Sequence, residues 1–97
     1  MTPEGRVKAE IKKWLTARGA YFFMPVQGGY GAAGLDFYVC LTGFFVAVEA
    51  KRPGEEPTPR QEIIMDAIRA AGGLAICAHS AKELEEKLGF TYHPAIP

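Results

Sequence analysis

Two apolar segments joined by a very short connection limit how this chain can fold. Residues 35–41 (LDFYVCL) and 44–50 (FFVAVEA) are rich in β-branched and aromatic side chains, a composition typical of strands. The connection between them, Thr42-Gly43, fits a two-residue turn. The sequence therefore predicts an antiparallel hairpin, and so short a turn fixes which residues face each other across it.

This register places Asp36 directly opposite Glu49 on one face of the sheet. They are the two charged residues between positions 21 and 50. Like charges opposite each other destabilise a sheet, and the apolar neighbours would solvate them poorly. Lys51 points to the same face as Glu49 because side chains alternate along a strand, and it offers one positive charge. A divalent cation offers two and accepts carboxylate oxygens as ligands, so we predict a cation site here.

The same groups match the requirements of phosphodiester hydrolysis. A metal held by Asp36, Glu49 and the carbonyl of Ala50 would lower the pKa of a bound water and polarise a phosphate oxygen. Lys51 would orient or deprotonate the attacking water, or meet the developing charge with its ammonium group. Two alternatives stay open. The Glu-x-Lys triplet also occurs by chance on surface strands, where it serves solubility, and a longer turn would break the register.

Residues 29–34, GYGAAG, match the G-x-G-x-x-G fingerprint of a dinucleotide site. That fingerprint requires a helix after its third glycine, because the helix N-terminus receives the pyrophosphate. Here Gly34 opens the strand-like segment instead. We therefore expect no nucleotide cofactor, and we interpret the glycines as a flexible loop that admits a substrate backbone close to Asp36.

Three further segments predict helices. Thr2 and Thr58 are each followed by proline and start helices that end near Gly19 and Gly72. Residues 81–89 predict a short amphipathic helix. The predicted buried stripes of the two longer helices are Val7, Ile11, Trp14 and Leu15 in the first, and Ile64, Ala67, Ile68 and Ala71 in the second.

Two further segments predict strands. Pro25 puts residues 21–26 near an edge or a strand end. Residues 74–79 are apolar, which favours a central strand. The fold class is therefore α/β, with the order α-β-β-β-α-β-α: a small mixed sheet flanked by helices. We assign residues 1–97 to a single domain.

The cysteines and histidines do not predict a metal site. Cys40 and Cys77 lie in apolar, strand-like segments, so we expect two buried thiols. A zinc site needs more cysteine and histidine at closer spacing, and neither His79 nor His93 supplies it. The longest apolar run is too short for a membrane span, and the N-terminus has no secretory pattern. We expect a cytosolic protein with no membrane partner.

Charge is unevenly distributed although the net charge is zero. The neutral balance argues against a protein that depends on bulk attraction to nucleic acid. Residues 1–20, however, contain five basic and two acidic side chains. This basic helix is either a solvated surface or a face for phosphates. If the chain binds DNA, the expected phosphate contacts are Arg6, Lys8, Lys12, Arg52 and Arg60.

Gly34-Leu35-Asp36, followed after the hairpin by Glu49-Ala50-Lys51, resembles the PD-(D/E)xK nuclease superfamily. Within it, the chain is most similar to the VRR-NUC domains, the virus-type replication and repair nucleases. The resemblance covers about residues 4–80 and departs from the family at Leu35, where proline is usual. It implies a restriction-endonuclease-like core and Mg²⁺ or Mn²⁺ as cofactor. The implied activity is a DNA endonuclease, often a homodimer that cuts branched DNA in phage-type replication, recombination or repair, in a bacterial or phage-infected cytosol.

The resemblance adds Glu4 and Gln61 to the expected catalytic site, with Glu4 reaching the metal through a water. Each has another explanation. A carboxylate near a helix N-terminus gains about 0.3–1 kcal/mol from the helix dipole, although Glu4 also falls on the inward stripe. Gln61 completes a capping box with Thr58, which is sufficient reason for its presence. Two alternative functions also stay open: a non-catalytic nucleic-acid-binding module of the same fold, and a subunit of a larger nuclease complex.

Overall fold

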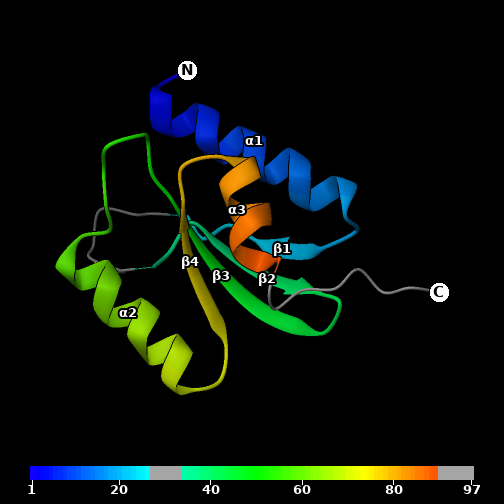
Figure 1. Cartoon of the computed structure of the whole chain (residues 1–97), viewed down its shortest axis with the longest axis vertical. Helices are drawn as coiled ribbons and strands as arrows, with labels where there is room; N and C mark the ends of the chain where they lie inside the picture. The colour runs from blue at the N-terminus through cyan, green and yellow to red at the C-terminus, as the bar shows by residue number, and fades with distance from the viewer. Residues whose placement is uncertain (27–33, 90–97) are drawn as a thin grey trace.

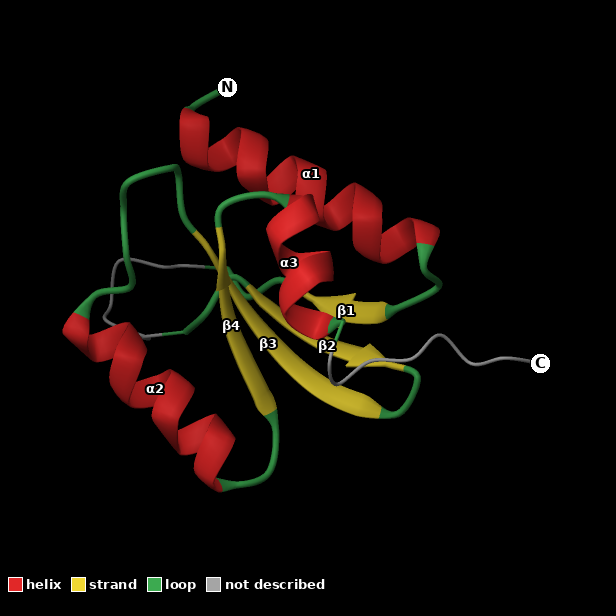
Figure 2. Ribbon diagram, in the orientation of Figure 1, coloured by secondary structure: helices red, strands yellow, loops and turns green. Residues whose placement is uncertain are grey.

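One mixed sheet of four strands is covered by helices on both faces (Figure 1, Figure 2). The computed structural model describes residues 1–26 and 34–89. Its elements are α1 (Pro3–Ala17), β1 (Tyr21–Phe23), β2 (Phe37–Leu41), β3 (Phe44–Ala50), α2 (Pro59–Ala70), β4 (Leu74–Ala78) and α3 (Ala81–Leu88). The predicted fold class and the order α-β-β-β-α-β-α are confirmed.

The predicted hairpin forms with the predicted register. Thr42 and Gly43 have φ values of 47° and 88°, the positive values that a type I′ turn requires at both central positions. Leu41 pairs with Phe44, and the antiparallel ladder of β2 and β3 continues to Phe37 opposite Val48. The ladder ends there, and Asp36 directly precedes β2 on the side that leads to Glu49.

The sheet order is β1-β2-β3-β4, with β3 and β4 parallel and the other pairs antiparallel. β1 is an edge strand, as Pro25 predicted. The central placement of the last strand is wrong, because β4 pairs with β3 alone among the described strands. Its apolar composition has another cause: Ala75 and Cys77 belong to the core under α2, while Ala78 belongs to the core under α1 and α3. Both faces of this edge strand are covered.

Two cores lie on opposite faces of the sheet. In Figure 1, α1 and α3 lie side by side over one face, and their buried residues pack against inward residues of β2 and β3. Thr2 caps α1 as predicted, and Val7, Ile11 and Leu15 are buried, whereas Trp14 is half-buried. On the opposite face α2 packs mainly on β4. Its predicted stripe is wrong in part: Ile64 and Ile68 are half-buried, but Ala67 and Ala71 are exposed.

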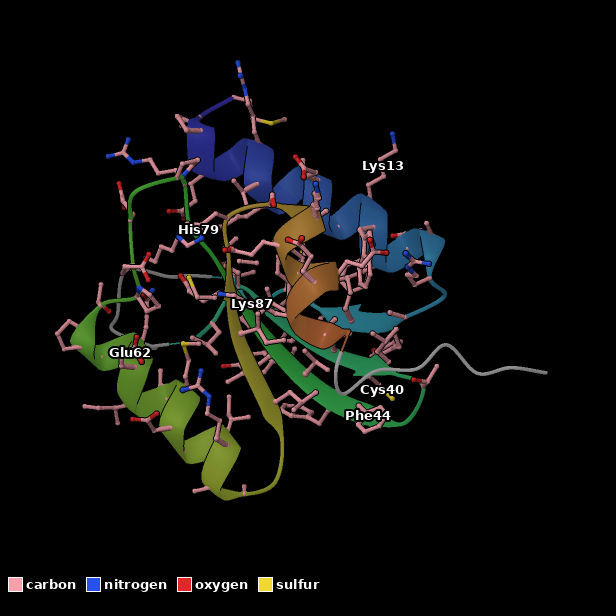
Figure 3. All side chains as sticks on the ribbon, viewed as in Figure 1. Lys13, Cys40, Phe44, Glu62, His79 and Lys87 are labelled. Carbon is pink, nitrogen blue, oxygen red and sulfur yellow. The ribbon has the colours of Figure 1, made fainter. Side chains whose placement is uncertain are left out.

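The reason is the position of α2. Met65, rather than the predicted alanines, enters the core, so the alanine side of the helix faces an open apolar groove. Cys40 is also exposed, contrary to prediction. It lies near the hairpin turn, where it pairs with Phe45, and far from Glu62 of α2 (Figure 3). Cys77 is buried, as expected.

Some sequence-based expectations concern parts of the chain outside the described residues. These are most of the glycine-rich segment at 27–33, and the C-terminal residues 90–97 with His93. The described residues after Gly34 lead into β2 rather than into a helix, which removes the context that a dinucleotide fingerprint needs. Within residues 1–26 and 34–89, no helix combines the length and apolar character that crossing a bilayer requires.

Candidate active site

Three charged side chains are buried in the part of the chain that the structure describes: Asp36, Glu49 and Lys51, with 7%, 2% and 7% of their surface exposed. They lie together at the end of the sheet where β2 begins and β3 ends. Burying a charge is costly unless it is paired. A concentration of this kind in one place, in a domain whose other described core residues are apolar, indicates a functional site.

The hairpin brings Asp36 onto the backbone of β3. Asp36 Oδ2 accepts a hydrogen bond of 2.8 Å from the Ala50 N–H. In an extended strand the N–H and C=O of one residue point to the same side, so the Ala50 carbonyl is directed to the Asp36 side as well. The Lys51 N–H points the other way and donates to the carbonyl of Ala78 in β4. The Asp36 carboxylate and the Ala50 carbonyl therefore lie on the same side of β3.

Glu49 is held by one of its two carboxylate oxygens. Oε2 accepts a hydrogen bond of 3.0 Å from Gln61 Nε2 and lies 3.5 Å from Lys51 Nζ. Oε1 is buried and has no hydrogen-bond partner among the described residues. Burial, reinforced by the nearby charge of Asp36, raises the pKa of Glu49 to about 7, although Lys51 acts in the opposite direction. Glu49 is therefore held in an environment that opposes its negative charge.

The residues present fit a small divalent cation. A buried carboxylate oxygen without a partner, a second carboxylate and a backbone carbonyl are hard oxygen donors, the type that Mg²⁺ and Mn²⁺ prefer. The raised pKa of Glu49 also fits a cation site, because a positive charge at this position would favour the ionised carboxylate.

α1 contributes a basic side chain that the sequence did not place in the site. Lys8 Nζ lies 3.1 Å from Asp36 Oδ1 and 3.7 Å from Glu4 Oε2. Burial lowers the pKa of Lys8, but the hydrogen bond and charge of Asp36 outweigh it and raise that pKa overall. Glu4 is half-exposed and reaches Asp36 through Lys8. The available signal was spacing: Lys8 follows Glu4 by one helical turn, so the two share a face.

The other expected phosphate contacts are exposed on the surface. Arg6 and Lys12 are exposed on α1, Arg52 follows Lys51 directly, and Arg60 is exposed on the first turn of α2. Arg52 forms an ion pair with Glu55. The predicted capping box is confirmed, because Gln61 Oε1 accepts from the Thr58 N–H at 2.9 Å while the Thr58 hydroxyl accepts from the Gln61 N–H. Gln61 thus caps α2 and also holds Glu49.

Comparison with known proteins supports the same assignment. A solved structure described as a VRR_NUC domain is similar to this chain, with a TM-score of 0.77 and 28% sequence identity. The match covers 96% of this chain and 100% of that one. No protein-family model matches the sequence, and no curated protein does. The resemblance inferred from Asp36 and Glu49-x-Lys51 is confirmed at the level of the whole fold, which is that of a VRR_NUC domain.

Proposed function

We propose that this chain, which has the fold of a VRR_NUC domain, is a metal-dependent endonuclease that hydrolyses phosphodiester bonds in DNA. The observation that supports this most directly is the joint burial of Asp36, Glu49 and Lys51, together with a Glu49 oxygen that has no hydrogen-bond partner in the described part of the chain. A structural salt bridge would not need a second buried acid beside the first. A cation site would need both.

In this proposal Asp36, Glu49 and the Ala50 carbonyl hold Mg²⁺ or Mn²⁺, and Glu4 contributes through a water. When bound, such an ion supplies an activated water and polarises the scissile phosphate. Gln61 serves the site by fixing Glu49 Oε2, so that Oε1 stays directed to the ion. Its hydrogen bond also links the carboxylate to the first turn of α2, a rigid support.

Lys51 is placed to stabilise negative charge or to transfer a proton. Its ammonium is buried beside Glu49, where a low local dielectric strengthens its interaction with a phosphate. It would orient or deprotonate the attacking water, or stabilise the negative charge that develops on the phosphate. Lys8 occupies the side of Asp36 closest to α1 and would contact a substrate phosphate from there.

The DNA is proposed to lie across the surface between α1 and the start of α2. The proposed phosphate contacts are Arg6, Lys8 and Lys12 on α1, and Arg52 and Arg60 between β3 and the first turn of α2. Contacts to phosphates position a duplex without reading its sequence, which suits an enzyme that selects branched DNA by its shape. A junction has two strands to cut, so we propose that the chain acts as a homodimer with two active sites.

The test is cleavage of supercoiled plasmid and of a four-way junction, with Mg²⁺, Mn²⁺ or EDTA. Metal-dependent cutting is expected, with preference for the junction. Glu49→Ala and Lys51→Ala should abolish it while the circular dichroism spectrum stays unchanged. Glu62→Gln is a control, because Glu62 is an exposed acid on the first turn of α2, next to Gln61. Full activity in either active-site variant would refute the mechanism.

A non-catalytic member of this fold would bind DNA without cutting it in any metal. A subunit of a larger nuclease would cut after its partner is added. The same assay, with a gel-shift measurement beside it, separates these alternatives from the proposed enzyme.

A further inference from the structure

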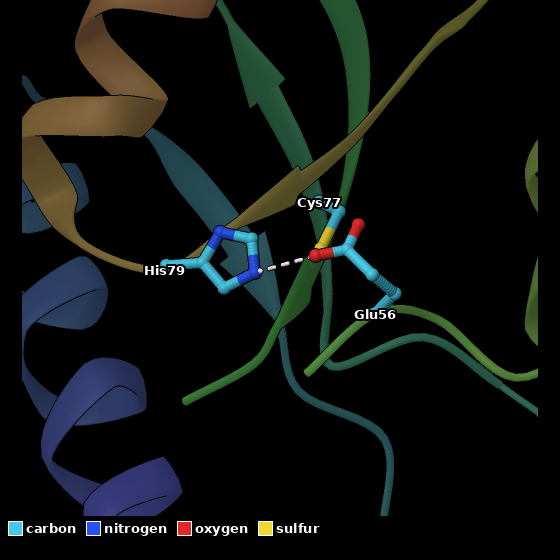
Figure 4. Close-up of side chains that lie close together, drawn as sticks. All are labelled: Glu56, Cys77 and His79. Carbon is cyan, nitrogen blue, oxygen red and sulfur yellow. Dashed lines mark ion pairs between the residues drawn. The ribbon is translucent and has the colours of Figure 1, made fainter. Parts of the chain in front are cut away.

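A second group of side chains with metal-binding chemistry lies on β4 and the neighbouring connection. Glu56 precedes α2, Cys77 lies in β4 and His79 follows β4, and their ligand atoms are within 4.8 Å of one another. Figure 4 shows the three side chains converging. The spacing in the sequence predicted no metal–histidine site. The fold provides the missing ligand by bringing Glu56 back across β4.

His79 is oriented by partners on both sides. Its Nδ1 lies 2.7 Å from Glu83 Oε1, in the carboxylate–histidine arrangement that fixes the tautomer of metal-bound histidines. Its Nε2 is thereby directed to the other side, 3.2 Å from Glu56 Oε2 and 2.7 Å from the Glu55 carbonyl. The ring nitrogen that would bind a metal therefore faces the other two ligands of the group.

The surrounding charges favour a cation. The carboxylates of Glu56, Glu83 and Glu49 act on the Cys77 thiol, against the ammonium of Lys87, which donates a 2.7 Å hydrogen bond to the Cys77 carbonyl. Burial first, and these carboxylates next, raise the pKa of the thiol to about 11.

We propose that Glu56, Cys77 and His79 form a zinc site, separate from the oxygen site of Asp36 and Glu49. A thiolate, an imidazole and a carboxylate are ordinary Zn²⁺ ligands, and three protein ligands leave a fourth position for water. Mg²⁺ avoids sulfur and nitrogen, so ligand chemistry sorts the two cations between the two sites. Binding displaces to solvent both the thiol proton of Cys77 and the His79 Nε2 proton, which is directed to the Glu55 carbonyl.

The consequence is a clamp on the connection between β3 and α2. This connection begins after Ala50 and carries Lys51 at its start, and it leads to the helix turn that carries Gln61. A bound Zn²⁺ would tie it to β4 through Glu56. Lys51 and Gln61, which contact Glu49 Oε2, would then be held at a fixed distance from that carboxylate. The site does not depend on the proposed nuclease activity, because its ligands are different residues.

Co²⁺ is a suitable probe, since it replaces Zn²⁺ and gives a thiolate-to-cobalt charge-transfer band when sulfur is a ligand. We expect metal-free protein to bind one Co²⁺ with this band, and Zn²⁺ to bleach it. Cys77→Ala should abolish the band, whereas Cys40→Ala, which removes the exposed thiol, should keep it. His79→Gln and Glu56→Gln change half-buried or exposed side chains, so they should fold and bind Co²⁺ roughly tenfold or more weakly.

The Glu49→Gln variant distinguishes the two sites. It should retain the thiolate band, and loss of the band in that variant would place the ion in the nuclease site and overturn the proposal. The proposal is equally overturned if wild-type protein shows no band, if Cys40→Ala loses it, or if His79→Gln and Glu56→Gln bind Co²⁺ as wild type does. In those cases His79 is an imidazolium held between the carboxylates of Glu83 and Glu56.

Discussion

Glu49 is the residue at which function and stability conflict. It is almost fully buried, it faces a second carboxylate, and one of its oxygens has no partner among the described residues. Gln61 and Lys51 hold the other oxygen, but they do not cancel the effect of burial on its pKa. A site prepared for a cation in this way destabilises the metal-free fold, and that effect can be measured.

Glu49→Gln should stabilise the metal-free protein at alkaline pH. The pKa of Glu49 is about 7 in the folded protein, against an ordinary value of 4.5. Between these values the folded state holds more protons than the unfolded chain, so the contribution of Glu49 to stability falls as pH rises and is lost above pH 7. Glutamine cannot ionise. In EDTA we expect a gain on the order of 1–3 kcal/mol near pH 8 and little near pH 5, measured by urea unfolding.

Glu62→Gln is the matched control for this measurement and should show no gain that grows with pH, because Glu62 is exposed. An equal effect of Glu49→Gln at both pH values would contradict the argument. So would a loss of stability at alkaline pH.

Lys8→Met should strengthen metal binding. The Lys8 ammonium lies 3.1 Å from Asp36 Oδ1, and in the proposed site this oxygen would bind the cation. Methionine keeps most of the aliphatic stem but removes the competing charge. For a partly exposed ion pair worth about 0.2–1 kcal/mol, we expect Mn²⁺ affinity to rise by a few-fold in isothermal titration calorimetry. Lys12→Met changes an exposed lysine on the same helix and should leave the affinity unchanged. Weaker Mn²⁺ binding by Lys8→Met would show that Lys8 supports the site instead.

At the scale of elements, the hairpin and the start of α2 were predictable because their signals are local. Thr42-Gly43 dictates the turn, the turn dictates the register, and the register brings Asp36 to Glu49. The position of β4 was not predictable in this way. A strand covered by helices on both faces has the same apolar composition at an edge as in the centre, so composition alone could not distinguish them.

Contacts between distant elements had no comparable signal in the sequence. Lys8 meets Asp36 because α1 packs across the sheet, and Glu56 meets Cys77 because the connection after β3 returns over β4. Spacing places Lys8 beside Glu4, but the contact of Lys8 with Asp36 and that of Glu56 with Cys77 do not follow from spacing along the chain. Cys40 was placed in the core for a related reason: strand composition does not indicate where the covering helix ends.

Gln61→Glu should separate the two roles of the first turn of α2. Glutamate keeps an acceptor for the Thr58 N–H, so the capping box survives, but it replaces the donor to Glu49 with a second negative charge. We expect near-normal stability of the metal-loaded protein and a large loss of cleavage. Thr58→Ala is the complementary variant: it should cost about 1 kcal/mol of stability in urea unfolding and retain cleavage. Equal loss of cleavage in both variants would show that Gln61 acts only as a helix cap.

At the scale of the whole molecule, the candidate active site and an open apolar groove lie toward opposite ends of the hairpin. The site lies where β2 begins and β3 ends, whereas the groove lies between the hairpin turn and α2. The groove has a volume of about 720 Å³ and is bordered by Phe44, Phe45 and Ile63, which are 44%, 50% and 70% exposed. From Glu49 to Phe44 at the turn is about 17 Å at ordinary strand rise, but the groove also reaches Tyr38, two residues from Asp36 along the chain. The end of the groove at the hairpin turn is therefore separate from the site.

If two copies associate through this groove, their active sites are left free at the outer ends of the assembly, as cutting two strands of a junction requires. A net charge of zero adds no bulk repulsion between copies. Light scattering should then give about twice the 10.6 kDa chain mass. Ile63→Asp should shift it to the monomer value and reduce junction cleavage more than plasmid nicking, since each active site stays intact. Phe23→Asp changes an exposed aromatic on β1, outside the groove, and should leave the dimer intact. A monomeric wild-type protein, or a dimer that Phe23→Asp dissociates and Ile63→Asp does not, would exclude the groove as the interface.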